Sequence, residues 1–324
     1  MMHAASAAGS IGDVPGLLVG HAHDERALTG CTAILIPGGG VCGVDVRGAA
    51  PGTRETDLLA PTAHIERVHG LCLSGGRAFG LDAASGVVAF LEERGLGYDA
   101  RGWCVPLVPA AVIFDLGIGD GHVRPDRAMG YTAAEAARPG AVAEGNVGAG
   151  CGASVGKLAG IERAMKGGVG TACVCLEGGL LVGALAVVNA LGAVVDSATG
   201  ARIAGPRAED GTLFDDDIAL IVARERARTA EGGNTTLVVV ATNARLTKAG
   251  ATRVALLAHD GIARAIVPAH LSGDGDVAFA VSTGEHEAGV DLVGTLGARV
   301  TAVAIARAVR AARPAGGLPA AGAP

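Results

Sequence analysis

Short apolar runs recur along the chain and predict buried β-strands. These runs occupy residues 32–37, 41–46, 109–115, 168–176, 180–188, 193–196, 235–241 and 277–282. Apolar residues at helical spacing predict helices at residues 78–93, 133–137, 249–264 and 290–311. The mixture of strands and helices places the protein in the α/β class.

The order of the runs also predicts how they pair. Residues 32–37 and 41–46 flank three glycines and are expected to form a hairpin, and the three runs between 168 and 196 are expected to be consecutive strands of one sheet. No internal repeat or linker divides the chain, so residues 1–324 are predicted to form a single domain. The tail 313–324 is rich in Pro, Gly and Ala and is predicted to be disordered.

Composition narrows the class of protein. Half of the residues (50%) are hydrophobic but only 2% are aromatic, and 53 are glycine, so aliphatic side chains and closely packed backbones must form the core. The net charge of -6 includes no basic block, which argues against nucleic acid and anionic membranes as partners. We expect no secretory signal and no membrane span. The 7 cysteines are expected to be reduced, as in a cytoplasmic protein.

A hydroxyl residue stands where a loop changes into a strand. Gly232-Gly233-Asn234 is typical of a loop, and Thr235 begins the β-branched run that follows. A threonine in this position usually satisfies a turn. The alternative is that the chain is cut before Thr235, because a threonine with a free α-amine carries its own base, whose ordinary pKa is about 8. The local pattern leaves both interpretations open.

The glycine-rich segment 145–157 resembles two nucleotide-binding motifs but fits neither. As a phosphate-binding loop it has Cys151 where glycine is required and Leu158 where a hydroxyl would hold Mg²⁺. As a dinucleotide fingerprint it lacks the strand that should precede it. What remains is Lys157, which is embedded among small residues and differs in this from an ordinary surface lysine.

Three polar residues stand at the ends of predicted strands. Asn189 ends the run 180–188, where it can complete a turn or donate to an oxyanion. Asp274 and Asp276 flank Gly275 just before the run 277–282, so both carboxylates can point into one pocket. Paired carboxylates shift each other's pKa and can orient a neighbouring donor.

Two further patterns have simpler interpretations. Gly75-Gly76 precedes a predicted helix and can cradle an anion, but close packing of helix on sheet is favoured. His21 and His23 stand at alternate positions in the run 18–24 and could be metal ligands, but a pair of polar residues beside a turn is favoured over a metal site.

Taken together, these segments resemble the L-aminopeptidase/D-esterase (DmpA-type) family of self-processing hydrolases over nearly the whole chain. Within that family the chain is most similar to the branch that hydrolyses 6-aminohexanoate (nylon) oligomers. The segments that carry the resemblance are Val19-Gly20-His21, Thr29 to Thr32, Ser74 to Leu81, Ala111 to Asp115, Gly148 to Lys157, Asn234-Thr235-Thr236 and Asp274-Gly275-Asp276.

The resemblance implies a fold and a mode of maturation. The family has a four-layer αββα sandwich of the N-terminal-nucleophile kind, similar to that of ornithine acetyltransferases. Its members are cut once and the two pieces stay folded together, which here implies pieces 1–234 and 235–324. They need no cofactor, and they form homo-oligomers, often tetramers.

The resemblance also implies residue roles. The bond between Asn234 and Thr235 matches the site of self-cleavage, and Thr235 matches the nucleophile. The supporting catalytic residues match Lys157, Asn189, Asp274 and Asp276. In this scheme the α-amine or the lysine takes the proton, the asparagine stabilises the oxyanion, and the two aspartates hold the ammonium and the threonine in place.

Two positions depart from the family pattern. Phe114 stands in the substrate-binding site where the family usually has tyrosine, so a hydroxyl is missing. Residues 270–273 read His-Leu-Ser-Gly where the family usually has His-Thr before the Asp-Gly-Asp segment. Activity or specificity is therefore expected to differ from the family's.

The implied activity is hydrolysis of amide bonds in small peptides or aliphatic oligomers through an acyl-enzyme on Thr235. Scarcity of aromatic residues favours aliphatic amides over a wide aromatic cleft. The alternatives are an acyltransferase of the ornithine-acetyltransferase type, an aminopeptidase with D-esterase activity, and a sheet protein that is never cut.

Overall fold

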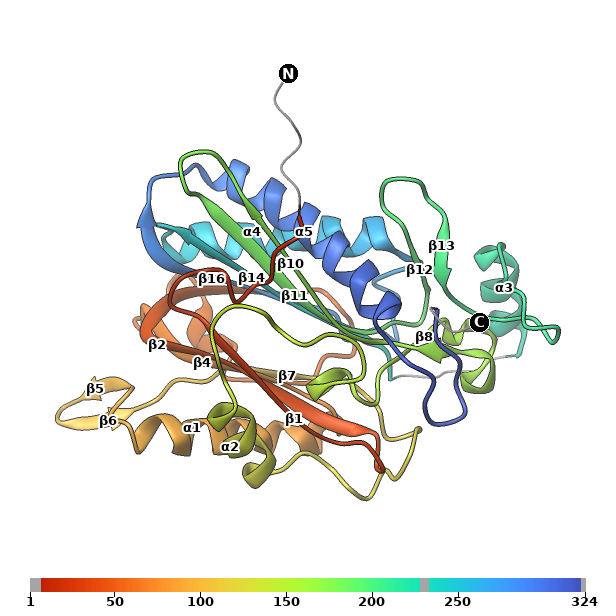
Figure 1. Ribbon diagram of the computed structural model, residues 1–324, viewed down its shortest axis with the longest axis horizontal. Helices are drawn as coiled ribbons and strands as arrows, with labels where there is room; N and C mark the ends of the chain where they lie inside the picture. The colour runs from red at the N-terminus through yellow and green to blue at the C-terminus, as the bar shows by residue number, and fades with distance from the viewer. Residues whose placement is uncertain (1–6, 228–232, 322–324) are drawn as a thin grey trace.

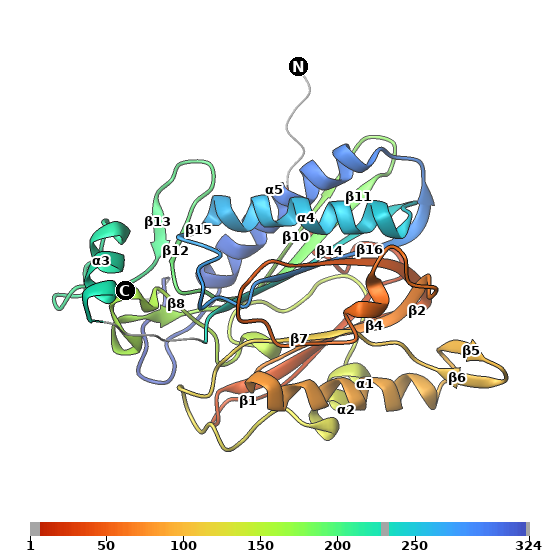
Figure 2. The same cartoon turned by 180° about the vertical axis from the view of Figure 1, so that it is seen from behind.

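The computed structural model of the protein describes residues 7–227 and 233–321, and it consists of four layers (Figures 1 and 2). Two helices cover the outer face of one sheet, a second sheet packs beneath the first, and two more helices cover its outer face. The outer helices are α4 (Lys248–Ala265) and α5 (Val290–Arg310) on one side, and α1 (Ala83–Glu92) and α2 (Arg127–Glu135) on the other. The predicted αββα sandwich is confirmed.

The long strand β2 (Thr29–Val46) belongs to both sheets. Its second half pairs with β16, in the sheet beneath α4 and α5, and its first half pairs with β1 and β4 in the other sheet. The first sheet also contains β10 (Gly168–Cys175), β11 (Leu181–Asn189), β14 (Thr235–Ala244) and β16 (Val277–His286). The second contains β1 (Leu18–Asp24), β4 (Arg67–Ser74), β7 (Ala110–Val112) and β3 (Thr53–Arg54).

The predicted hairpin of residues 32–37 and 41–46 is therefore wrong. Both edges of the first half of β2 are already occupied, by β1 and by β4, so its second half finds a partner in the other layer. The glycines between the halves permit this change. The pairing with β4 shifts between Leu35 and Gly40, and Gly39 has a positive φ of 69°, which residues with a side chain rarely adopt.

Two apolar cores explain the uninterrupted run in β14. Leu237 and Val239 are buried between the two sheets, and the alternate residues Val238 and Val240 are buried beneath the outer helices. A strand covered on both faces needs apolar residues at every position. The third core lies between the second sheet and helices α1 and α2.

Three consecutive strands of one sheet were predicted between residues 168 and 196, but the third of them lies outside the first sheet. β10 and β11 pair as expected, but β12 (Ala193–Val195) forms a separate small sheet with β13 (Arg202–Ala204) and β15 (Ile266–Val267). It cannot pair with β11, because β14 occupies that edge. The remaining strands are β5 (Tyr98–Ala100), β6 (Trp103–Val105), β8 (Ser154–Val155) and β9 (Met165–Lys166).

Short helices complete the fold. The α-helix α3 spans Asp217–Ala227. The 3₁₀ helices are η1 (Asp57–Leu59), η2 (Arg77–Asp82), η3 (Gly148–Gly150), η4 (Lys157–Ala159) and η5 (Ile161–Arg163).

Most of the C-terminal tail is packed against the domain. Leu318 is buried in a small cluster with Leu28 and Ile118, and the amide of Lys166 donates to the carbonyl of Pro319 at 2.8 Å. The prediction that the tail is disordered is thus wrong for residues 313–321, because one leucine and one carbonyl suffice to anchor the chain. Residues 322–324 lie outside the described part.

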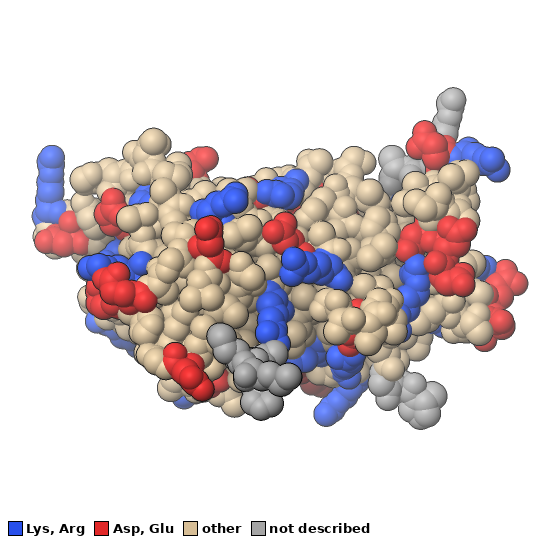
Figure 3. All heavy atoms as spheres, turned by 90° about the horizontal axis from the view of Figure 1, so that it is seen from above, with Lys and Arg blue, Asp and Glu red and all other residues tan. Residues whose placement is uncertain are grey.

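Helix α5 is apolar because it packs against α4 and the first sheet. By length and composition it is able to cross a membrane, but 67% of its apolar window is buried inside the fold. On the face seen in Figure 3, acidic and basic side chains are interspersed among wide areas of uncharged surface.

Candidate active site

The ends of three neighbouring strands lie side by side at one end of the first sheet. β11 ends at Asn189, which lies opposite Thr235, the first residue of β14. β16 runs parallel to β14, so it begins at the same end of the sheet. The loop that leads into β16 carries Asp274 and Asp276. Strand register therefore brings together four of the site residues predicted from the sequence.

Thr235 lies against the carbonyl of the residue before it. Its hydroxyl donates to the Asn234 oxygen at 2.5 Å, and the amide of Gly275 donates to the same oxygen at 2.8 Å. Both Asn234 and Thr235 are buried. Only glycine fits between the two aspartates, because a Cβ on Gly275 would lie 2.8 Å from the Thr235 hydroxyl oxygen. The buried hydroxyl and a polarised carbonyl are thus held together.

Lys157 and Asn189 form a second buried group. The ammonium of Lys157 donates to the side-chain oxygen of Asn189 at 2.9 Å and to its main-chain oxygen at 3.0 Å. The amide of Ser154 donates to the same side-chain oxygen at 3.0 Å. These contacts fix the orientation of the asparagine, whose NH₂ donates to the carbonyls of Phe114 (3.0 Å) and Gly233 (3.2 Å).

This arrangement refines the oxyanion assignment. The resemblance assigns oxyanion stabilisation to Asn189, but both N–H groups of its side-chain amide are directed at the carbonyls of other residues. The carbonyl of Asn234 instead receives the amide of Gly275.

The two aspartates are held differently. One oxygen of Asp276 accepts from the amide of Thr236 at 2.6 Å, and the other lies 2.8 Å from Nδ1 of His270. Asp274 accepts from the amide of Leu271 through one oxygen, while its Oδ1 has no hydrogen-bond partner among the described residues. Burial, and then the charge of Asp276, raise the pKa of Asp274 to about 6.

The raised pKa of Asp274 predicts a pH-dependent cost in stability. In the unfolded chain the pKa of this carboxyl is about 3.9, so the folded protein binds the proton more tightly than the unfolded chain does. The free energy of unfolding is therefore highest below pH ~4, and this contribution is lost as pH rises through about 6. In an uncut Thr235→Ala background, Asp274→Asn should therefore become more stabilising, relative to Asp274, by on the order of 2–3 kcal/mol between pH 4 and 7. Urea unfolding at several pH values measures this difference, and a difference independent of pH would contradict it.

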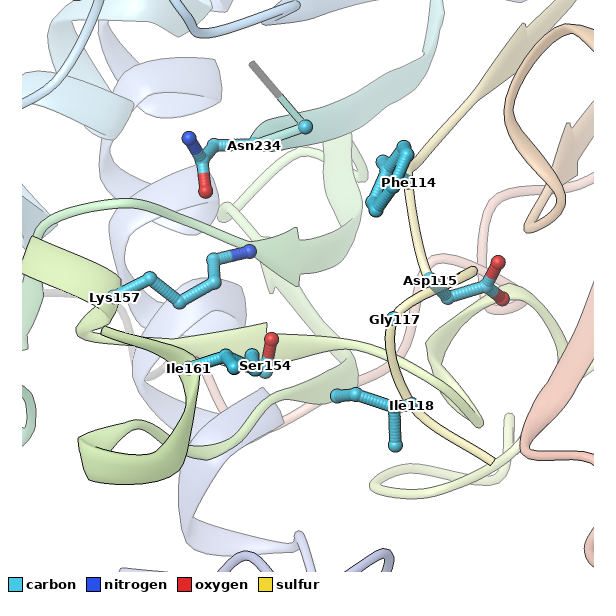
Figure 4. A pocket seen from close by; sticks show the side chains of 9 residues that line it. Phe114, Asp115, Gly117, Ile118, Ser154, Lys157, Ile161 and Asn234 are labelled. Atoms are coloured by element: carbon cyan, nitrogen blue, oxygen red, sulfur yellow. The ribbon is translucent and has the colours of Figure 1, made fainter. Parts of the chain in front are cut away.

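A pocket with a volume of about 260 Å³ opens beside these groups. Figure 4 shows the Lys157 side chain reaching toward its centre, with Phe114 and Ile118 across from it and Asn234 at one end. Phe114, to which the resemblance assigns a role in substrate binding, is one of the residues that line the pocket. The carboxylate of Asp115 turns away from the pocket centre, toward partners in the neighbouring loops.

The glycine pair Gly75-Gly76, which precedes η2 and α1, binds a carboxylate of the protein itself, that of Asp115. The amide of Gly76 donates to Asp115 at 2.7 Å, and the hydroxyl of Thr29 donates to the other oxygen of the same carboxylate at 2.7 Å. Together these contacts hold the loop that carries Phe114.

The alternating histidines lie apart from the pocket. The Nδ1 of His21 lies 2.9 Å from the Thr32 hydroxyl, and burial lowers the pKa of His21 to about 4. Within residues 7–227 and 233–321, no group of three His, Cys, Asp or Glu side chains is placed to hold a metal ion.

The structure adds three groups that the sequence did not indicate. The Gly275 and Ser154 amides are main-chain donors, which leave no signature in side-chain patterns. His270 belongs to the segment 270–273 that departs from the family pattern, but neither its residue type nor its position predicted a contact with Asp276. Gly232 and the residues before it back to 228 lie outside the described part.

A comparison with known proteins gives the family. Residues 9–320 match the profile of peptidase family S58. The chain belongs to peptidase family S58. This S58 protein is accordingly a hydrolase of peptide or amide bonds, as the resemblance implied.

Its relatives carry two kinds of name. It is 44% identical over 339 residues to an uncharacterised aminopeptidase of Mycobacterium tuberculosis, covering 96% of each chain. It is 36% identical over 277 residues to a 6-aminohexanoate-oligomer endohydrolase of Kocuria sp., covering 84% of this chain and 74% of the relative. The mycobacterial protein thus shares more of its sequence with this S58 protein than that oligomer hydrolase does.

Solved structures agree on the fold. The L-aminopeptidase D-Ala-esterase/amidase of Ochrobactrum anthropi, described as a variant of the Ntn hydrolase fold, superposes with a TM-score of 0.72 at 21% identity, covering 98% of this chain and 90% of that one. A β-aminopeptidase of Burkholderia sp. superposes with a TM-score of 0.69 at 22% identity, covering 96% and 90%. The S58 protein therefore has the N-terminal-nucleophile type of fold that the resemblance implied.

Proposed function

We propose that the chain cuts itself between Asn234 and Thr235, and that the new N-terminal threonine hydrolyses amide bonds of small peptides or of aliphatic oligomers of the 6-aminohexanoate type. The observation that carries this proposal is the buried Thr235 hydroxyl, 2.5 Å from the carbonyl oxygen of Asn234. That oxygen is also polarised by the Gly275 amide. A hydroxyl held beside a polarised amide is the arrangement that self-cleavage requires.

Self-cleavage proceeds in two steps. The Thr235 oxygen attacks the carbonyl carbon of Asn234, and the Gly275 amide stabilises the negative charge on the oxygen. The C–N bond breaks, the nitrogen takes up the proton that the hydroxyl loses and becomes the α-amine of Thr235, and Asn234 remains attached as an ester. Water then hydrolyses that ester, which leaves a carboxylate on Asn234 and restores the hydroxyl.

The mature enzyme reuses the same groups on an external amide. The Thr235 hydroxyl attacks the substrate carbonyl, and the α-amine of Thr235 or the amine of Lys157 accepts the proton. Asn189 gains a role at this stage. Its NH₂ now donates to Gly233, and once the segment that ends at Asn234 withdraws, that N–H can stabilise the oxyanion of the substrate.

The lining of the pocket and the names of the relatives support two candidate classes of substrate. Residues 233 and 234 occupy one end of the pocket, which marks where the acyl part of a substrate would lie. Phe114, Ile118 and Ile161 supply apolar surface there, which suits an aliphatic acyl chain. Aminopeptidase activity is a second candidate, because the mycobacterial relatives at 44–45% identity bear that name.

Intact mass of the purified protein tests the first part of the proposal. We expect two masses, those of residues 1–234 and 235–324, which elute together under native conditions. A single full-length mass after prolonged incubation would overturn self-cleavage.

Substrate assays test the second part. The protein would be incubated with free and N-acetylated peptides and with 6-aminohexanoate oligomers, with and without an added amine acceptor. We expect hydrolysis products from uncharged aliphatic amides. Cleavage restricted to free N-termini would favour the aminopeptidase, and acyl transfer to the amine in preference to water would favour an acyltransferase.

A further inference from the structure

A half-buried imidazole lies behind Asp276, outside the groups that the proposed reaction uses. His270 Nδ1 is 2.8 Å from Oδ2 of Asp276, whose other oxygen accepts from the amide of Thr236. A carboxylate only accepts hydrogen bonds, so Nδ1 carries the proton. Asp276 is thus fixed from both sides, by a ring N–H and by the amide that directly follows the nucleophile.

His270 is in turn held by α4 and β2. Its ring packs edge-on against that of His259, with 4.9 Å between centroids and 63° between planes. Nε2 of His259 lies 3.1 Å from Oδ1 of Asp45 and 3.2 Å from the main-chain oxygen of the same residue. A continuous series of polar groups therefore runs from β2 to the start of β14. The titratable groups around His270 are His259 on α4 and Asp274 and Asp276 in its own loop, and Asp45 on β2 contacts His259 in turn.

The backbone of His270 supports a functional role. Its φ is 61°, in the left-handed region that costs most residues free energy, although Asn, Asp and His tolerate it better than others. Nε2 of the same ring is buried and has no hydrogen-bond partner among the described residues. The positive φ and the unpartnered Nε2 both lower the stability of the folded protein. A histidine at this position is therefore expected to have a functional reason, which we look for in its contact with Asp276.

We propose that His270 is a positioning residue for the reaction at Thr235. By donating Nδ1–H to Asp276 it holds that carboxylate against the Thr236 amide, and so sets the position of the Thr235 hydroxyl relative to the Asn234 carbonyl. The inference rests on the proposed self-cleavage. It adds His270, from the loop before β16, to the residues that were given roles by the resemblance.

Two substitutions of nearly equal size separate this role from packing. Asn and Asp both tolerate a positive φ, and asparagine can place an N–H close to the position of Nδ1. His270→Asn should therefore cleave within about threefold of the parent rate. His270→Asp removes the donor and sets two carboxylates against each other, so cleavage should slow at least about tenfold, the cost of losing one charge-assisted hydrogen bond.

The measurement is the fraction of cut chain against time after cell-free synthesis, by intact mass. Melting temperatures of both variants in the uncut Thr235→Ala background report folding. As a second variant, His270→Gly accepts the positive φ without strain and leaves a space for imidazole. It should cleave slowly and be accelerated by imidazole added to the solution, which a packing role alone would not produce.

The outcomes separate the two proposals. If the parent does not cut itself, the proposed function fails. If the parent cuts and both His270→Asp and His270→Gly cut at the parent rate, the positioning role fails alone. Slow cutting of His270→Gly that imidazole does not change, together with a lowered melting temperature, would also overturn it in favour of packing.

Discussion

Thr235→Ala is expected to yield a single chain of residues 1–324 without amidase activity. The hydroxyl that lies 2.5 Å from the Asn234 carbonyl oxygen is removed, and with it the group that would form both the internal ester and the acyl-enzyme. Loss of a nucleophile typically costs at least about 10⁴-fold in rate. Intact mass and hydrolysis of an aliphatic amide measure the two effects.

Two matched variants control for packing at this buried position. Thr235→Val preserves the branched shape that suits the start of β14, so it should fold as the parent does and remain uncut. Thr235→Ser keeps the hydroxyl and should still be cut and active. Cutting in the valine variant, or amidase activity in the alanine variant, would mean that another residue is the nucleophile.

Asp276→Asn and Asp274→Asn are expected to lower the catalytic rate on the order of a hundredfold, with a smaller effect on substrate binding. In Asp276→Asn the side-chain oxygen can still accept from the Thr236 amide, and His270 can change its tautomer to accept from the new NH₂. The substitution therefore removes charge while preserving shape. Steady-state kinetics, intact mass and melting temperature measure the result.

Asp126→Asn is the control for these charge changes. Asp126 caps α2 in the opposite helix layer, and asparagine caps helices about equally well. Its rate of self-cleavage and its activity should match those of the parent. Near-parental cutting and turnover in both site variants would refute the catalytic assignment of the aspartates, whereas a lowered melting temperature with normal activity would support a structural role for them.

Asp274 links stability and function at this site. The buried carboxylate has an oxygen without a hydrogen-bond partner in residues 7–227 and 233–321, and its pKa is raised; both features oppose folding at neutral pH. Asp274→Asn should therefore be more stable than its parent above pH ~6 and yet slower. Such a trade is expected where a group is kept for its chemistry rather than for the fold.

Much of the architecture can be predicted from the sequence because it depends on local pattern. The run Leu237–Val240 is apolar at every position, and its two faces do lie in two different cores. Helical spacing likewise predicts α4 and α5 to within a residue at each end. The change from loop to strand at Thr235 is visible for the same reason, since glycine and β-branched residues have opposite backbone preferences.

The sequence alone did not determine which strand pairs with which. Residues 41–46 have the pattern of a strand, but their pairing with β16 rather than with residues 32–37 depends on β1 and β4 occupying the nearer edges. In the same way β12 is excluded from the main sheet by β14. Pairing is a competition among distant segments, and no local periodicity reports its result.

The site shows the same division. The sequence indicates Thr235, Lys157, Asn189 and the two aspartates by residue type and by resemblance to the family. Only the tertiary structure assigns the Gly275 amide to the Asn234 carbonyl and brings His259 and Asp45 behind His270. A main-chain donor such as the Gly275 amide cannot be predicted from residue types. Contacts between residues more than 200 positions apart, such as His259 and Asp45, form only when the layers pack together. The chemistry of the groups was thus set by the sequence, and their geometry by the fold.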